Sequence, residues 1–175
     1  MVYFRILSLN INTNRMSDLI ASLKNPFKFR LYLLANLPIG FLAGLKIVEL
    51  SEEKAVTGIR YKFLTKNPFR SVYFACLAMG AELASGILGL IHIHGSNPAV
   101  SMLVVHMDAD FTKKAVGKIQ FTCQDGALIR KAIEESKQTG EGRTLVATSI
   151  GTDEKGDVVA TFRITWSFKV KTGRV

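Results

Sequence analysis

A single acidic side chain lies inside a long apolar stretch of this chain. From Ser71 to Ile93 the one formally charged residue is Glu82, and most of the others are Ala, Gly, Leu, Ile, Met and Phe. A carboxyl group in apolar surroundings has a raised pKa, which suits a general base near neutral pH, and a carboxylate can also attack a carbonyl directly. The alternatives are a buried acid satisfied by the backbone or by Ser85, or a helix residue that faces solvent.

The residues before this acid offer a way to bind developing negative charge. The apolar stretch predicts a helix over 71–93, and a helix N-terminus supplies free N–H groups and partial positive charge for an oxyanion. Residues 73–75 lie at that end. Tyr73 can donate a hydrogen bond, or it packs in the core. Asn67 can orient a water or bind a carbonyl, or it forms a turn before Pro68.

Helix geometry separates these two groups of residues. Glu82 follows Tyr73 by nine positions, so at about 1.5 Å per residue it lies roughly 13 Å farther along the helix. One chain cannot easily bring both to the same carbonyl. Two antiparallel helices related by a twofold axis can do so.

The elements around the long helix follow from hydrophobic periodicity. Residues 16–24 predict a short amphipathic helix, and residues 29–45 predict a helix broken near Pro38. Strands are predicted at 45–50 and 54–65. In the second strand a half-buried alternation sets Ile59, Tyr61 and Phe63 against Arg60 and Lys62.

After the long helix the pattern returns to the period of two that strands show. The predicted elements are strands at 103–111, 117–123, 143–151 and 156–171, with a helix over 125–139. In the first of these strands, one alternating set is Leu103, Val105, Met107, Ala109 and Phe111, and the other is Val104, His106, Asp108 and Asp110.

These elements predict an α+β fold in which a curved antiparallel sheet of about six strands wraps around the long central helix. The Ala and Gly residues of that helix allow the strands to come close. No repeat or linker divides the chain, so we expect a single domain. It comprises an N-terminal extension with helices over 1–43 and the main sheet-and-helix domain over 44–175.

The composition supports a folded domain with an anionic partner. The chain has 175 residues, of which 48% are hydrophobic, and a formal net charge of +9. Such a hydrophobic content argues against disorder, and such a charge favours nucleic acid, a lipid surface or a phosphorylated ligand. A basic surface without a specific partner fits the charge equally well.

Cysteine and histidine usage argues against disulfides and metal sites. Cys76 and Cys123 both lie in apolar segments, which predicts a reduced, cytoplasmic protein. No Cys/His cluster supports zinc, and the first residues lack a full signal-peptide core. A membrane span over 71–93 is disfavoured, because a carboxylate at mid-helix costs about 3 kcal/mol on insertion scales.

The sequence resembles the hotdog-fold thioesterases, in particular the phenylacetyl-CoA thioesterase type and a poorly characterised bacterial branch. The family pattern is an Asn, a loop with Gly, His-Gly-Gly, and a helix with Asp or Glu nine residues after the His. Here Asn67 matches the Asn, Tyr73 stands at the His position, Phe74 and Ala75 replace the glycines, and Glu82 matches the acid. The likeness covers about residues 44–170.

This resemblance implies an acyl-CoA thioesterase that works as a homodimer or a dimer of dimers, with each site between protomers. It implies catalytic roles for Glu82, Asn67 and Tyr73, and binding of the thioester carbonyl by the amides of Phe74 and Ala75. Coenzyme A would be part of the substrate, and no metal or other cofactor is implied. Three further cations can meet its phosphates, or they are solvated surface residues: Lys113, Lys114 and Arg143.

Two other functions remain open. A non-catalytic acyl- or acyl-CoA-binding hotdog protein is favoured by the loss of His-Gly-Gly, whereas retention of Glu82 favours the enzyme. A nucleic-acid-binding module would need a basic helix or an aromatic-basic strand face. The chain offers little of either beyond Arg60, Tyr61 and Lys62, so we expect no nucleic acid partner.

Overall fold

The computed structural model describes residues 16–171, and the predicted extension before Met16 lies outside them. Six strands form one antiparallel sheet in the order β1-β2-β4-β5-β6-β3. The strands are β1 (Lys46–Leu50), β2 (Ala55–Arg60), β3 (Val100–Phe111), β4 (Lys118–Cys123), β5 (Arg143–Thr152) and β6 (Val158–Val170). The helices are α1 (Met16–Lys24), α2 (Pro26–Asn36), α3 (Pro38–Ala43), α4 (Phe74–Ile93), α5 (Gly126–Thr139) and the short 3₁₀ helix η1 (Phe63–Thr65).

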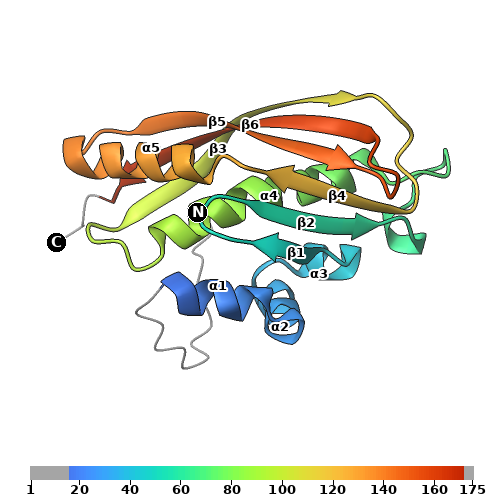
Figure 1. Ribbon diagram of the computed structural model, residues 1–175, viewed down its shortest axis with the longest axis horizontal. Coiled ribbons are helices and arrows are strands. Elements are labelled where there is room, and N and C mark those ends of the chain that lie inside the picture. Colours follow the sequence, from blue (N-terminus) through green and yellow to red (C-terminus); the bar gives the residue numbers. More distant parts are fainter. Residues whose placement is uncertain (1–15, 172–175) are drawn as a thin grey trace.

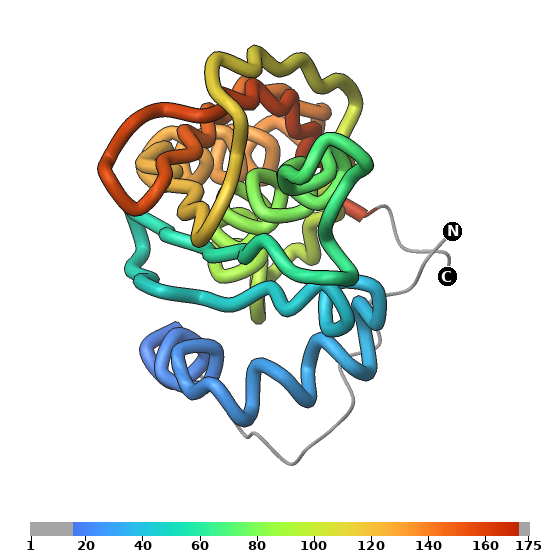
Figure 2. Tube along the Cα trace, turned by 90° about the vertical axis from the view of Figure 1, so that its right-hand side faces the viewer, coloured from blue at the N-terminus to red at the C-terminus, as the bar shows by residue number. Residues whose placement is uncertain are grey.

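The sheet curves around α4, while α1, α2 and α3 lie beyond the β1 edge (Figure 1). The view along the length of the molecule shows the strands enclosing α4 on several sides (Figure 2). This arrangement confirms the predicted α+β fold with a strongly curved sheet around one long central helix.

Glycines in α4 let the sheet approach the helix backbone. A Cβ atom built on Gly80 would lie 2.8 Å from a ring carbon of Phe121, and one on Gly89 would lie 2.8 Å from Cε of Met102. Real Cβ atoms do not approach other atoms so closely. The glycines of α4 therefore allow the strands to come close, as the sequence predicts.

Buried hydrogen bonds join α4 to the sheet as well. Thr57 Oγ1 on β2 donates to the carbonyl of Gly80 at 2.7 Å, and Trp166 Nε1 on β6 donates to Ser85 Oγ at 3.0 Å. Leaving such a buried donor without a partner costs about 1–3 kcal/mol, so these bonds help to fix the rotation of α4 within the sheet.

The break between α2 and α3 falls where the sequence predicts it. α2 ends at Asn36 and α3 begins at Pro38, which has no N–H to continue the first helix. Asn25 caps α2 by accepting from the backbone N–H groups of Phe27 and Lys28, each at 3.1 Å. The three short helices thus pack as separate pieces along the edge of the sheet.

Two predicted boundaries were wrong. The strand expected over 54–65 ends at Arg60, because Thr65 Oγ1 donates to the carbonyl of Arg60 at 2.7 Å and folds the chain into η1. Phe63, expected on the buried side of that strand, is 78% exposed. The long helix begins at Phe74 rather than at residue 71, since the preceding residues form a loop.

A bulge in β3 changes the predicted faces of that strand. Val104 lies opposite Trp166, but His106 lies opposite Thr165, so Val105 is an extra residue in the ladder. Directly opposed residues share a face, which places Val104 and Met107 on the inner side with Trp166. The prediction had placed Met107 with Leu103 instead, because a strict period of two does not reveal a bulge.

α4 is the one helix in residues 16–171 that is long and apolar enough to cross a membrane. In the fold, 61% of its most apolar window is buried inside the protein. The sheet therefore accounts for its hydrophobicity, and α4 is the core helix of the domain.

Candidate active site

The side of α4 that the sheet leaves open carries Glu82. The partly exposed residues of this helix recur every three or four positions, which defines one stripe along its length. We call this the open stripe; it comprises Ala75, Ala78, Met79, Glu82, Gly86, Leu90 and Ile93. Glu82 therefore lies partly exposed among small and apolar neighbours, and apart from the exposed Phe74 the rest of the helix is buried.

The Glu82 carboxyl group has no hydrogen-bond or ion-pair partner within the described chain. Ser85 Oγ donates to the backbone carbonyl of Glu82 at 3.3 Å, so the serine does not satisfy the side chain. Glu82 Oε1 lies beside Gly86, where a Cβ atom would be 3.1 Å from it and 3.2 Å from the Trp166 ring. Burial in these apolar surroundings raises the pKa of Glu82. The Glu82 carboxylate is therefore a stronger proton acceptor than a carboxylate in water.

Tyr32 on α2 is a neighbour of Glu82 that the sequence did not reveal. Burial, and secondarily the negative charge of Glu82, raise the pKa of the Tyr32 phenol to about 12. The ring of Tyr32 stacks on Phe29, with centroids 6.2 Å apart. The N-terminal helices therefore place a protonated hydroxyl near the acid, although no motif in the sequence links the two.

The N-terminus of α4 offers two free backbone donors. The Tyr73 N–H donates to the carbonyl of Thr65 at 2.8 Å, and the Cys76 N–H donates to the carbonyl of Tyr73 at 2.9 Å. The N–H groups of Phe74 and Ala75 have no acceptor within residues 16–171. Of the three amides predicted to bind an oxyanion, these two are available, and the Tyr73 amide is already used.

The side chains at this helix start are exposed. Tyr73 is 45% exposed and Phe74 is 56% exposed, and their rings meet edge to face with centroids 4.9 Å apart. In the single chain Tyr73 is therefore a surface residue and does not pack in the core. Its hydroxyl can reach a ligand at the start of α4.

Asn67 organises the loop that leads into α4. Its Oδ1 accepts from the backbone N–H groups of Phe69 at 2.9 Å and Ser71 at 3.1 Å, and its Nδ2 donates to Ser71 Oγ at 3.0 Å. This is the turn-forming arrangement considered for Asn67 in the sequence. Asn67 thereby fixes the approach of the chain to Phe74.

The fold keeps Glu82 away from the free donors of its own chain. Phe74 and Glu82 are on one continuous helix, so about 12 Å of helix rise separates them. Lys113 and Lys114 belong to the β3–β4 connection at the end where α4 begins, where the carbonyl of Ala115 accepts from Val72 N–H at 2.8 Å.

Two of the three cations predicted to meet phosphates already have acidic partners. Lys113 forms ion pairs with Asp153 and Asp157 of the β5–β6 turn, and these hydrogen bonds raise its pKa. Arg143 donates to Glu141 at 2.9 Å at the other end of the molecule, near the end of α5. In the isolated chain Lys114 is the exposed cation of this set for which no such pair is formed.

No group of three or more His, Cys, Asp or Glu side chains in residues 16–171 is arranged to hold a metal ion. His92 Nε2 lies 2.9 Å from the carbonyl of Glu52, which gives this histidine a structural contact with the β1–β2 turn.

Solved structures of other proteins share this fold. Protein PA5026 of Pseudomonas aeruginosa, described as of unknown function and as a probable thioesterase, has a TM-score of 0.71 at 22% identity, covering 83% of this chain and 97% of its own. A mutant of the Staphylococcus aureus thioesterase SAV0944 has a TM-score of 0.60 at 16% identity, covering 75% and 98%. The PaaI protein of the phenylacetic acid degradation operon of E. coli has a TM-score of 0.59 at 16% identity, covering 79% and 88%.

These likenesses confirm the predicted resemblance to thioesterase-like hotdog proteins at the level of the fold. No curated protein matches the chain in sequence. One family model, described as "Domain of unknown function (DUF4442)", matches residues 29–168. Because this match spans most of its length, the chain belongs to the DUF4442 family.

Proposed function

We propose that this protein is an acyl-CoA thioesterase that hydrolyses an acyl thioester at a site between two protomers. The observation that carries the proposal is Glu82, an unpaired acid of raised pKa on the open stripe of α4. The free N–H groups of Phe74 and Ala75 supply the other requirement, because they can bind a thioester carbonyl. The thioesterase descriptions of structurally similar proteins point to the same reaction class.

The second protomer follows from the separation of these groups and from the edge of the sheet. β3 ends the sheet and pairs with β6 on one side alone. Its exposed apolar residues include Leu103, Val105, Met107 and Phe111. An unprotected edge of this length favours pairing with another chain. Antiparallel pairing of two β3 strands would set two α4 helices side by side, with Phe74 of one chain near Glu82 of the other.

The proposed reaction uses these groups in a defined order. The Phe74 and Ala75 amides of one protomer hold the carbonyl oxygen, and the partner's Glu82 takes a proton from a water that attacks the carbonyl carbon. The tetrahedral intermediate then expels sulfur as the C–S bond breaks. Glu82 returns the proton to the leaving sulfur, which releases the carboxylic acid and the free thiol of coenzyme A.

A specific observation favours the non-catalytic alternative. Phe74 stands where a glycine would leave the helix start open, and its ring is 56% exposed beside the free amides. A ligand must therefore approach past this side chain. An acyl- or acyl-CoA-binding protein would tolerate such a narrowed entrance better than an enzyme that must align water with a carbonyl.

The experiment that separates these functions is release of free thiol from a panel of acyl-CoAs of different chain length. We expect turnover by the wild type and a loss of at least about a hundredfold in kcat for Glu82→Gln, in line with removal of a general base. Glu134→Gln on the exposed face of α5 is the control and should retain activity. Binding of acyl-CoA without turnover by the wild type would establish the alternative.

The position of the site between protomers has its own test. Subunits carrying Glu82→Gln, and subunits carrying Phe74→Pro to remove one amide donor, should each be inactive alone. If the site is shared, mixed dimers regain one intact site, and random mixing restores about a quarter of wild-type activity. No recovery in verified mixed dimers would place the whole site within one chain.

We also propose that the protein works in the cytoplasm. Cys76 and Cys123 are buried free thiols, and burial raises the pKa of Cys123 to about 11, which keeps it protonated and unreactive. A fold without disulfides among its described residues is compatible with a reducing compartment such as the cytoplasm.

A further inference from the structure

A basic cavity lies at the end of the sheet where β1 starts, β2 ends and β4 starts. It has a volume of about 240 Å³, and the end of α3 borders it. We call it the basic cavity. Its charged lining residues are Arg30, Lys46, Arg60, Lys62 and Lys118, and no Asp or Glu is among the residues that line it. Such a volume admits a phosphate group.

Two cations of this cavity, Arg30 and Lys62, are held in place by uncharged partners. The guanidinium group of Arg30 lies 4.7 Å from the centre of the Phe41 ring, and Lys62 Nζ donates to the carbonyl of Leu42 at 3.0 Å. These partners carry no charge. Within residues 16–171, Lys118 alone of the five cations has a carboxylate at ion-pair distance, that of Glu154 at 3.3 Å. Convergent positive charge in a cavity attracts an anion strongly.

Two glycines make room for this arrangement. A Cβ atom on Gly58 would lie 2.9 Å from Cε of Lys46, and one on Gly44 would lie 2.7 Å from Nζ of Lys62. Gly44 also has φ of 76°, which ends α3 in a left-handed conformation. Hydrogen at these two positions lets the lysine side chains lie close to the backbone beside the cavity.

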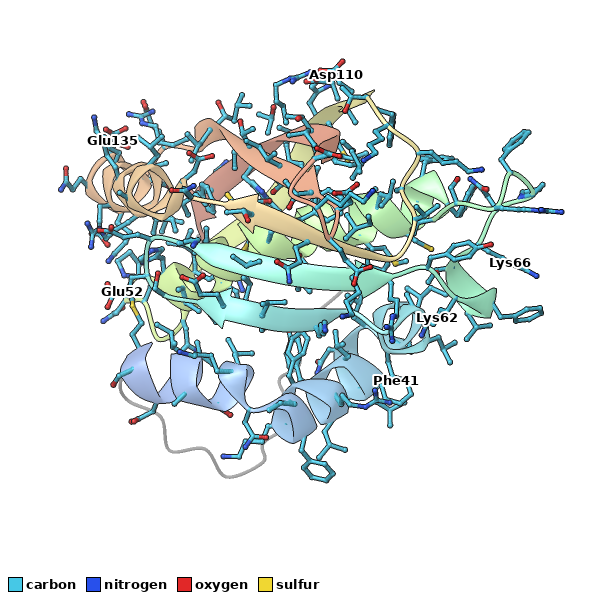
Figure 3. All side chains as sticks on the ribbon, turned by 45° about the vertical axis from the view of Figure 1, so that its right-hand side comes forward. Phe41, Glu52, Lys62, Lys66, Asp110 and Glu135 are labelled. Atoms are coloured by element: carbon cyan, nitrogen blue, oxygen red, sulfur yellow. The ribbon has the colours of Figure 1, made fainter. Side chains whose placement is uncertain are left out.

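The basic cavity lies at the same end of the molecule as the start of α4. Lys62 immediately precedes η1, and the chain then runs through the Asn67 loop to Phe74; Figure 3 shows Lys62 beside α3 and η1. Lys62 is also near enough to the first turn of α4 that its charge opposes the rise in pKa that burial imposes on the Cys76 thiol. The basic cavity and the free amides of Phe74 and Ala75 therefore lie at one end of the molecule.

We propose that the basic cavity binds phosphate groups of the coenzyme A portion of the substrate. This proposal rests on the proposed function for the identity of the ligand. The shared chemistry is a phosphate ester, and Lys and Arg suit it because they donate charge-assisted hydrogen bonds. The cavity thereby supplies the phosphate contacts that Lys113 and Arg143, already paired with acidic residues, are less free to make.

The test measures binding by calorimetry with adenosine 3′,5′-bisphosphate, coenzyme A, dephospho-coenzyme A and inorganic phosphate as separate probes. The informative variant is Lys46→Gln with Arg60→Gln, because neither side chain makes a hydrogen bond or ion pair within the described chain. The matched control is Arg130→Gln with Lys131→Gln on exposed α5, which removes the same charges. We expect affinity for the bisphosphate and coenzyme A to fall at least about tenfold in the first variant. It should change less than about twofold in the control and in Glu82→Gln.

Each result has a distinct meaning. If both double variants lost the same affinity, net charge alone would explain binding. The proposal that phosphate binds in the basic cavity would then be wrong. If inorganic phosphate bound as tightly as coenzyme A, the assignment of the basic cavity to the coenzyme A portion of the substrate would be wrong. If bisphosphate binding depends on Lys46 and Arg60 while no acyl-CoA is hydrolysed, the phosphate site stands and the thioesterase proposal fails. Circular dichroism and urea unfolding verify that each variant is folded.

Discussion

Glu82 combines an apolar environment with a position on the open stripe of α4, and neither property alone would suggest catalysis. Ser85, the partner that the sequence suggested for the acid, instead accepts from Trp166 and donates to a backbone carbonyl. The carboxyl group is left for a ligand, a proton or the nearby Tyr32. Its raised pKa also has a consequence for stability that does not depend on any substrate.

We expect wild-type stability to fall, relative to Glu82→Gln, as pH rises above about 4.5. The folded state raises the pKa of Glu82 above its ordinary value of 4.5, so the folded chain holds a proton that the unfolded chain has released. Each unit of that rise costs about 1.4 kcal/mol once the acid ionises. Urea unfolding at pH 4 and pH 8 measures this difference. A gap between the two proteins that is constant with pH would contradict it.

The packing of α4 against the sheet depends on glycines, which have no Cβ atom. The Phe121 ring packs on Gly80, and Thr57 donates to the carbonyl of Gly80. Side chains of β4 and β2 therefore contact the backbone of α4 directly at this point. Glycine is a poor helix former, and its presence in α4 makes sense because of the close approach that it allows. This close approach sets the position of Glu82 relative to the strands.

Gly80→Ala should therefore destabilise the protein by about 1–3 kcal/mol, because overpacking outweighs the gain of up to about 1 kcal/mol in helix propensity. Gly142→Ala is the control, since its Cβ atom would meet its nearest neighbours at 3.9–4.0 Å. Urea denaturation midpoints measure the difference. If Gly80→Ala were as stable as the wild type, the sheet and α4 would not be as closely packed as described.

The complete molecule that we propose is an assembly of at least two chains. The long β3 edge and the open stripe of α4 are both left uncovered in a single chain, and both would be covered if β3 strands pair. The shared active site is a consequence of the same pairing. Loss of the dimer should then remove activity without unfolding the domain.

Val105→Lys should shift the protein from dimer to monomer in sedimentation equilibrium, because a lysine on an edge strand opposes strand pairing. Val146→Lys on the central strand β5 is the matched control, since Val105 and Val146 are 52% and 51% exposed. The control should remain dimeric. A dimer that survives Val105→Lys, or a wild-type monomer, would exclude the proposed β3 interface.

Local pattern was sufficient for the elements of this protein, because hydrophobic periodicity and proline act over a few residues. It predicted the long apolar helix, the break at Pro38 and the strand over 156–171 that corresponds to β6. It also singled out Glu82, since a charge within an apolar run is visible in one dimension. It missed the β3 bulge, which depends on pairing with β6, and the early end of β2, where the hydrogen bond from Thr65 to the Arg60 carbonyl overrides the period.

Contacts between distant segments required the tertiary structure. Tyr32 comes near Glu82, and Arg30 joins Lys46, Arg60 and Lys118, because α2 folds back beside the sheet. The acidic partners of Lys113 in the β5–β6 turn became visible in the same way. Periodicity assigns each residue to a side of its own element, but burial and charge depend on which elements the chain brings together. For this reason the acid could be identified from sequence, whereas its neighbours and the basic cavity could not.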